Sequence, residues 1–273
     1  MLSSGSGESS VASSLEDAEA SAFLRIEQPH ELLSPSIERM AGDRTAAFEL
    51  KFLLPESLAR QLETWAAHRL QRDAFADERN GGSYQTTTLY LDTPQFDVFH
   101  RSAGFRRRKY RLRRYGHEQT LFLERKTRRG DRVKKRRSSV PLADLGLVCE
   151  HLGFGEWGGL WFSQRVALRK LQPACRLTYE RTAFVALTGG NPVRLTLDRH
   201  IRGAATTDWN LAPVEIGSGI LPGEVVCEFK FREAMPNLFK EVIADLQLQA
   251  GSISKYRRML TAAGFSAGSG EHD

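Results

Sequence analysis

The stretch FRRRKYRLRRYG, residues 105–116, opens the most charged part of the sequence. If it forms a strand, its side chains alternate between two faces, and one face carries four cations in succession: Arg107, Lys109, Arg111 and Arg113. A half-buried strand normally alternates apolar with polar residues so that one face can meet a core. Because like charges side by side on a sheet repel each other, this face predicts an anionic ligand.

The positive charge of the chain is concentrated around this stretch. Residues 106–137 contain sixteen Lys and Arg against three acids, a local balance of +13. Since the formal net charge of the whole chain is +6, the remaining residues sum to −7. Charge that belongs to one region is informative about binding partners rather than about general solubility.

Length, composition and cysteine content narrow the class of protein. The 273 residues, 41% of them hydrophobic, suffice for one large domain or two small ones. No apolar run approaches the roughly eighteen residues of a membrane span, and the N-terminus lacks the apolar segment of a secretory signal. The three cysteines, Cys149, Cys175 and Cys227, fit neither a disulfide framework nor a clustered metal site. We therefore expect a cytoplasmic protein without a membrane span.

The sequence predicts one folded domain, residues 43–264, between two disordered tails at 1–42 and 265–273, which are rich in small and polar residues. Strands are expected at 46–54, 83–94, 105–115, 119–127, 131–140, 174–187, 192–201 and 223–231. Helices are expected at 56–71, 142–152, 161–171 and 237–248, with a short one after 252–256. Because the strands follow one another in hairpin-like succession, the sheet should be largely antiparallel with helices on its outside, which is an α+β fold.

The same alternation places charge on one face of most predicted strands. These faces carry Glu49 and Lys51, Glu124 and Lys126, Lys134 and Arg136, Tyr179 and Arg181, Arg194 and Asp198, and Glu228 and Lys230. The opposite faces are mainly apolar. If the charged faces point inward, the sheet becomes a closed antiparallel β-tunnel of about eight strands, with a basic lumen and flanking helices. Periodicity alone favours the alternative, an open sheet with its polar face in water. Such a face, however, usually mixes Thr, Ser, Gln and Glu with its Lys and Arg, and this one hardly does.

Nine fragments carry a resemblance to a known family. ELKF, YLDTPQFDVF, YRLRRYG, FLERKT, VKKR, YERTAF, VRLTLD, CEFKF and SISKY occur in the order and spacing of the vacuolar transporter chaperone (VTC) domain, over about residues 45–262. That family is a polyphosphate polymerase branch of the triphosphate tunnel metalloenzymes. The resemblance implies a closed β-tunnel lined with basic residues, in agreement with the alternation of charge.

The resemblance also implies roles for individual residues. Catalytic cations that hold phosphate groups are implied at Lys51, Arg111, Arg113, Lys126 and Lys134. Further substrate contacts are implied at Tyr179, Arg181, Arg194, Lys230, Ser254 and Lys255. Glu228 matches the metal-binding carboxylate, which would hold Mn²⁺ or Mg²⁺ through oxygen.

One position departs from the superfamily signature and one from the fungal polymerases. Ala47 stands where the superfamily signature E-x-E-x-K has its first Glu, which argues against the thiamine-triphosphatase and adenylyl-cyclase branches, whereas VTC domains also lack that Glu. Ser252 stands where fungal polymerases are expected to have a Lys, so that one phosphate contact is in doubt.

The function expected from these residues is metal-dependent transfer of the γ-phosphate of ATP to a growing polyphosphate chain. Phosphoryl transfer needs positioning and preorganised positive charge more than a general base. Two alternatives stay open: a non-catalytic module that binds polyphosphate or inositol phosphates, and a tripolyphosphate hydrolase. Nucleic acid is the commonest partner of basic patches, but it is not expected here, because the region lacks exposed aromatic stacking platforms and other implied cations lie far away in sequence. The sequence does not predict the oligomeric state.

Several charged residues have an ordinary structural explanation. Outer-face or turn positions are expected for Arg125, Arg128, Arg129, Arg132 and Arg137. Glu124 can serve as an ion-pair partner of Lys126 or a neighbouring Arg, and Asp92 of YLDTP is expected to form a turn.

Overall fold

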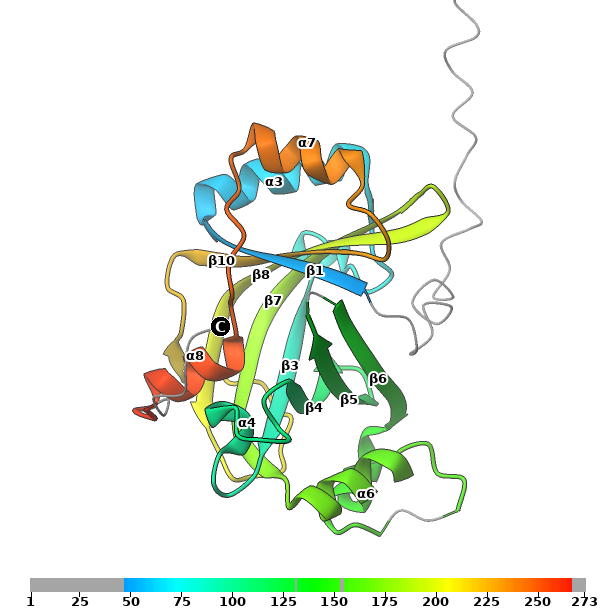
Figure 1. Cartoon of the computed structure of the whole chain (residues 1–273), viewed down its shortest axis with the longest axis vertical. Coiled ribbons are helices and arrows are strands. Elements are labelled where there is room, and N and C mark those ends of the chain that lie inside the picture. Colours follow the sequence, from blue (N-terminus) through cyan, green and yellow to red (C-terminus); the bar gives the residue numbers. More distant parts are fainter. Residues whose placement is uncertain (1–46, 131, 153–154, 267–273) are drawn as a thin grey trace, which may run out of the picture. The chain divides into compact units, whose positions relative to one another are not determined.

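The computed structural model describes residues 47–130, 132–152 and 155–266 (Figure 1). The predicted tail at 1–42 and residues 267–273 of the other tail lie outside these ranges. Phe265, which we assigned to the C-terminal tail, instead packs against Phe96 with ring centroids 4.6 Å apart. The folded chain therefore extends at least through Phe265.

Eight antiparallel strands form a closed ring. In order around the ring they are β7 (Gln172–Thr188), β3 (Ser83–Asp92), β4 (Arg108–Tyr115), β5 (Thr120–Arg129), β6 (Arg132–Pro141), β1 (Ala47–Pro55), β10 (Glu224–Phe231) and β8 (Asn191–Ala205). The ring closes because β8 also pairs with β7 over most of its length. Two short strands, β2 (Gln71–Arg72) and β9 (Ser218–Gly219), extend the sheet beside β7 and β8. The predicted closed tunnel of about eight strands is confirmed, and the open-sheet alternative is wrong.

Helices cover the outside of this ring. They are α3 (Glu56–Arg69), α4 (Asp97–His100), α5 (Leu145–Cys149), α6 (Leu160–Arg169), α7 (Asn237–Asp245) and α8 (Lys255–Ala262), with 3-10 turns η1 (Glu78–Asn80) and η2 (Leu142–Asp144). In Figure 1, α3 and α7 lie side by side over β1 and β10. No helix in the ranges given above is long and apolar enough to cross a lipid bilayer.

The apolar core lies between the strands and these helices, outside the lumen. Phe52 of β1 and Phe229 of β10 pack against each other and are buried beneath Phe239 of α7. Leu62 of α3 belongs to the same cluster. On β5, Leu123 points to a second cluster that contains residues of α6. The apolar faces therefore point outward and the charged faces inward, as the alternation predicts.

The structure differs from the predicted elements mainly at their ends. The helix predicted over 142–152 is divided into η2 and α5, and α5 ends before His151, whose φ of 60° is in the left-handed region. The strand predicted to begin at residue 105 begins at Arg108, because hydrogen-bonded turns occupy the residues before it. Asp92, predicted as a turn residue, accepts hydrogen bonds from the backbone N–H groups of Thr93, Val98 and Phe99. It therefore fixes the turn into α4.

Candidate functional site

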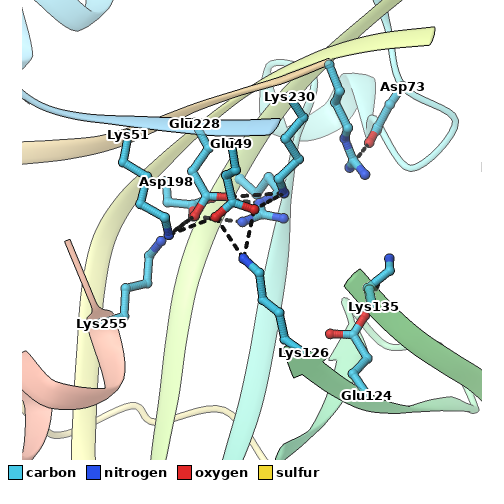
Figure 2. Close-up of polar contacts among 12 residues, drawn as sticks. Glu49, Lys51, Asp73, Glu124, Lys126, Lys135, Asp198, Glu228, Lys230 and Lys255 are labelled. Carbon is cyan, nitrogen blue, oxygen red and sulfur yellow. Dashed lines mark hydrogen bonds and ion pairs between the residues drawn. The ribbon is translucent and has the colours of Figure 1, made fainter. Parts of the chain in front are cut away.

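The charged faces of the strands meet in one lumen. Cross-strand pairs show this on β4 and β5, where Lys109 lies opposite Lys126 and Arg111 lies opposite Glu124. Residues directly opposite each other in a sheet share a face. Figure 2 shows side chains from β1, β5, β8 and β10 that point toward one another across this space.

Two neighbouring carboxylates, Glu49 of β1 and Glu228 of β10, form the centre of the first cluster. The Nζ of Lys51 lies 2.7 Å from Glu228 Oε1 and 3.2 Å from Glu49 Oε1. The Nζ of Lys126 lies 2.7 Å from Glu49 Oε2, and that of Lys230 lies 3.0 Å from Glu228 Oε2. Burial alone would raise the pKa of Glu228, but Lys230 and Lys51 outweigh it and hold that pKa well below its ordinary value. Both carboxylates are therefore ionised and bound by ammonium groups.

Asp198 of β8 forms a second cluster. Arg181 of β7 donates to both of its carboxylate oxygens, over 2.6 and 2.7 Å, and Lys255 at the start of α8 donates to Oδ2 over 2.6 Å. The ring of Tyr179 lies 5.1 Å from the Nζ of Lys255 and 5.4 Å from the guanidinium of Arg181. Asp198 is fully buried. These contacts join α8 to the wall of the tunnel.

Glu124 of β5 holds a third group of cations. Arg111 donates to its Oε2 over 2.6 Å, Arg137 lies 2.9 Å from Oε1, and Lys135 lies 3.9 Å from the same oxygen. Burial would raise the pKa of Glu124, yet Arg111 and Arg137 hold it well below the ordinary value. Glu124 thus serves as an ion-pair partner, one of the roles expected from the sequence, and Arg is its main partner.

A fourth carboxylate, Asp73, comes from the loop after β2. Its Oδ2 accepts hydrogen bonds from Arg194 over 2.6 Å and from the hydroxyl of Tyr84 over 3.0 Å. Arg194 also donates to that hydroxyl over 3.0 Å. Asp73 lies outside every predicted strand, so no sequence pattern linked it to the lumen.

Two lumen cations are held by hydroxyl groups instead of carboxylates. Lys109 donates to Ser254 Oγ over 2.9 Å, and Arg113 donates to Thr88 Oγ1 over 3.2 Å. No carboxylate of the described residues lies within ion-pair distance of either. Burial, together with the neighbouring Lys51 and Lys126, lowers the pKa of Lys109 well below its ordinary value. In the described part of the chain, these two cations therefore have no carboxylate to release when an anion binds.

Eleven cations and five carboxylates line this space, a formal excess of six positive charges. The cations are Lys51, Lys109, Arg111, Arg113, Lys126, Lys135, Arg137, Arg181, Arg194, Lys230 and Lys255. The carboxylates are Glu49, Asp73, Glu124, Asp198 and Glu228. An excess of this size in an enclosed space favours a compact polyanion as ligand.

Oxygen donors for a divalent cation occur around Glu228. Thr196 lies directly opposite Glu228 on β8, and its buried Oγ1 has no hydrogen-bond partner among the described residues. Glu49 is close enough for its charge to act on Glu228, because both carboxylates contact Lys51. Carboxylate and hydroxyl oxygens suit Mn²⁺ and Mg²⁺, so the donor chemistry fits. No group of three or more acidic, His or Cys residues arranged for a metal occurs among the described residues.

The structure brings together all but one of the predicted site residues. Ten of them surround the lumen: Lys51, Arg111, Arg113, Lys126, Tyr179, Arg181, Arg194, Glu228, Lys230 and Lys255. Ser254 is next to it as the N-cap of α8. Lys134 does not face the lumen, because it lies opposite Thr127 and is exposed. It shares its face of β6 with Arg136, whose guanidinium packs on the ring of Trp161 at 4.2 Å. The adjacent Lys135 faces inward instead.

Arg137 is a second residue whose predicted position differs from the structure. Its expected outer-face position is wrong, because it lies opposite Glu124 in the β5–β6 pairing and so faces the lumen. In the sequence KKRR, cations occupy both faces of β6, so alternation alone does not reveal which face is inward. Lys109, which the opening charge pattern placed on the inward face, could have been added to the site from that pattern. Lys135 could be assigned only from the strand pairing.

Comparisons with known proteins give three findings. A family profile described as the VTC domain matches residues 46–263. No curated protein matches the chain.

Three of the similar solved structures differ strongly in sequence. A candidate adenylate cyclase from Bacillus halodurans is 12% identical with a TM-score of 0.49, and the match covers 78% of this chain and 96% of that one. A Pyrococcus horikoshii protein is 12% identical with a TM-score of 0.44, covering 80% and 99%. A candidate adenylyl cyclase from Hippeastrum, described as having a dominant triphosphatase activity, is 11% identical with a TM-score of 0.46, covering 80% and 95%.

Proposed function

The chain belongs to the VTC domain family, and on this basis we propose that it is a polyphosphate polymerase. In this proposal the γ-phosphoryl group of ATP is transferred to the end of a polyphosphate chain, or to inorganic phosphate, inside the lumen. The observation that carries the proposal is the excess of cations over carboxylates on the inward faces of the ring. A lumen that held only water would not need this excess of positive charge, whereas a lumen that binds a polyanion would.

Arginine and lysine side chains would contact the phosphate groups in different ways. Arg111, Arg113, Arg181 and Arg194 offer planar forks that match two phosphate oxygens at once, and the lysines act as point charges. Because the loose transition state of phosphoryl transfer spreads negative charge over the equatorial oxygens, cations already in position stabilise it without reorganisation. The acceptor is itself an anionic phosphate, so no general base is needed.

Glu228, with Glu49 beside it, is the carboxylate we propose for a metal. A bound Mn²⁺ or Mg²⁺ would neutralise charge on phosphate oxygens. Lys51 and Lys230 contact the two oxygens of Glu228, so a bound divalent cation would have to displace these ammonium groups.

One observation favours a second candidate, a non-catalytic polyphosphate-binding module. Each of the five lumen carboxylates already has a cationic partner, so their presence is explained without a metal.

Because the three cysteines are free, we also propose the cytoplasm as the location, since thiols persist there.

The test is incubation of the purified protein with ATP and Mn²⁺, with separate assays for polyphosphate on a gel and for released phosphate. Formation of polyphosphate that grows with time supports the polymerase. Release of phosphate from tripolyphosphate without chain growth indicates a hydrolase instead. Binding of tripolyphosphate with neither reaction indicates the binding module.

A further inference from the structure

A groove lined by arginine lies outside the lumen. It has a volume of about 430 Å³, and five arginines line it: Arg106, Arg107, Arg108, Arg128 and Arg129. They come from the turn that precedes β4, from the first residue of β4 and from the end of β5. None of the residues described above as lining the lumen belongs to this groove.

The groove continues the cationic face of the lumen. On β4 and β5 the inward pair Arg111–Glu124 is followed by the inward pair Lys109–Lys126. The backbone N–H of Arg128 then donates to the carbonyl of Arg107 over 2.9 Å, which extends the strand pairing outward. Arg107 and Arg128 are therefore the next residues on the same face, about 7 Å beyond Lys109 and Lys126 by the rise of two strand residues. Arg108 lies opposite Thr127 and alternates to the other face, as does Arg129, so Arg107 and Arg128 are the two groove residues that continue the lumen.

Within the described ranges, part of the positive charge of the groove is uncompensated. Among the described residues, no carboxylate lies within ion-pair distance of Arg107, Arg108 or Arg129. Arg106, Arg107, Arg128 and Arg129 are exposed. Guanidinium groups on adjacent residues of two strands can each hold phosphate oxygens through two N–H groups.

We propose that this groove is an outer binding site for polyphosphate, which holds the chain where it leaves the lumen at the end formed by β4 and β5. This inference rests on the proposed function, because it extends the same ligand beyond the same tunnel. The continuity of the cationic face favours a flexible linear phosphate chain over a duplex, which cannot enter the lumen. Phe105, the aromatic residue next to the groove, is covered by the guanidinium of Arg169 at 5.0 Å, so bases have no free ring there on which to stack.

The experiment compares a short ligand with a long one in chelator. The test variant is Arg107→Gln/Arg128→Gln, and the matched control is Arg60→Gln/Arg79→Gln, which removes two exposed arginines from α3 and η1. The probes are tripolyphosphate, a polyphosphate of about fifty units, and single-stranded DNA of equal charge. Thermal melts of all variants establish that they are folded.

We expect the test variant to bind tripolyphosphate within about twofold of the wild type and to bind the long chain about tenfold more weakly at about 100 mM salt, with a shallower salt dependence. The control variant should match the wild type with all probes. Unchanged long-chain binding, an equal loss in the control, or tighter binding of DNA than of polyphosphate overturns the outer site. If the wild type fails to bind tripolyphosphate but binds the long chain through these arginines, the outer site stands and the proposed lumen function falls.

Discussion

Glu228 is the residue at which catalysis and simple anion binding make opposite demands. Its carboxylate reduces the positive charge offered to phosphate, and it is held between Lys51 and Lys230. We expect Glu228→Gln to abolish metal-dependent turnover of ATP. Affinity for tripolyphosphate in chelator should be retained or raised, because two ammonium groups lose their partner and one negative charge is gone. Calorimetry in chelator and an ATP consumption assay with Mn²⁺ measure the two effects separately.

The same substitution should lower the stability of the ligand-free protein, because it leaves buried ammonium groups less compensated. Arg113→Ala is the matched comparison, since it should weaken both binding and turnover. Wild-type turnover of ATP by Glu228→Gln would mean that the carboxylate is only an ion-pair partner.

Lys109 makes binding depend on pH. Its pKa in the free protein is well below the ordinary value through burial and the nearby Lys51 and Lys126, and a bound phosphate would favour its charged form. Binding should therefore take up protons between the free-state and bound-state pKa values of Lys109, and affinity should fall as pH rises through that interval. Calorimetry of tripolyphosphate binding in chelator, in two buffers of different ionisation enthalpy, measures that uptake.

Lys109→Arg keeps the positive charge at every pH in this range, so it should reduce the proton uptake. For stability the sign is the opposite of that for affinity: the unfolded chain binds the proton of Lys109 more tightly than the folded one, so this residue's destabilising effect decreases as pH rises. Equal proton uptake by wild type and Lys109→Arg would assign the pH dependence to another group.

At the scale of elements, the pairing of β6 with β5 decides which lysine of VKKRR can meet the ligand. Lys135 lies opposite Lys126 on the inward face, and Lys134 lies opposite Thr127 on the outward face. We expect Lys135→Ala to weaken tripolyphosphate binding several-fold and Lys134→Ala to leave it within about twofold, as an exposed charge on the far face is screened. Binding isotherms of the two variants, measured side by side, give the answer. A larger loss for Lys134→Ala would mean that the register of β6 is displaced by one residue.

The helix α8 depends on contacts made by its first residues. Tyr256 is buried, donates its hydroxyl to Asp92 and stacks on Tyr90 with ring centroids 5.2 Å apart. Tyr256→Phe keeps the ring but leaves the buried carboxylate without this donor, which should cost about 1–3 kcal/mol. Thermal melts should show the loss, and amide exchange should show it first in α8.

The position of Lys255 depends on the same docking, since it binds Asp198 from the start of α8. Tyr256→Phe should therefore also weaken phosphate binding slightly. If the variant is as stable as the wild type, the hydroxyl of Tyr256 does not secure α8.

At the scale of the whole molecule, the lumen holds mutually repelling cations in an enclosed ring. A phosphate ligand adds contacts and relieves this repulsion, and a ligand that binds only the folded state raises stability by about 2.7 kcal/mol at one hundred times its dissociation constant. We expect tripolyphosphate to raise the melting temperature more than duplex DNA at equal concentration, because a duplex cannot enter the ring. The opposite order would favour a nucleic-acid partner bound on the outer surface.

The sequence by itself determined the alternation of charged and apolar residues, and its resemblance to the VTC domain indicated that the charged faces point into a closed tunnel. Phe48, Leu50 and Phe52 alternate with Glu49 and Lys51, and a strand side chain has only two directions, so one face had to meet the helices. The same rule assigned Arg111, Arg113, Arg181, Arg194 and Glu228 to one space. It failed on β6, where Lys134, Lys135, Arg136 and Arg137 give both faces the same charge.

Only the tertiary structure decided how this charge is compensated. Asp73 comes from a loop, and its link to Arg194 spans 121 residues of sequence, so no local pattern could predict it. The ion pairs of Glu49, Glu124 and Asp198 depend on cross-strand register, which hydrogen bonding between distant strands sets. Likewise, Lys109 lacks a carboxylate partner among the described residues because Ser254, 145 residues away, is the group that reaches it. Local side-chain alternation is fixed by backbone geometry, whereas the choice of partner is fixed by the closing of the ring.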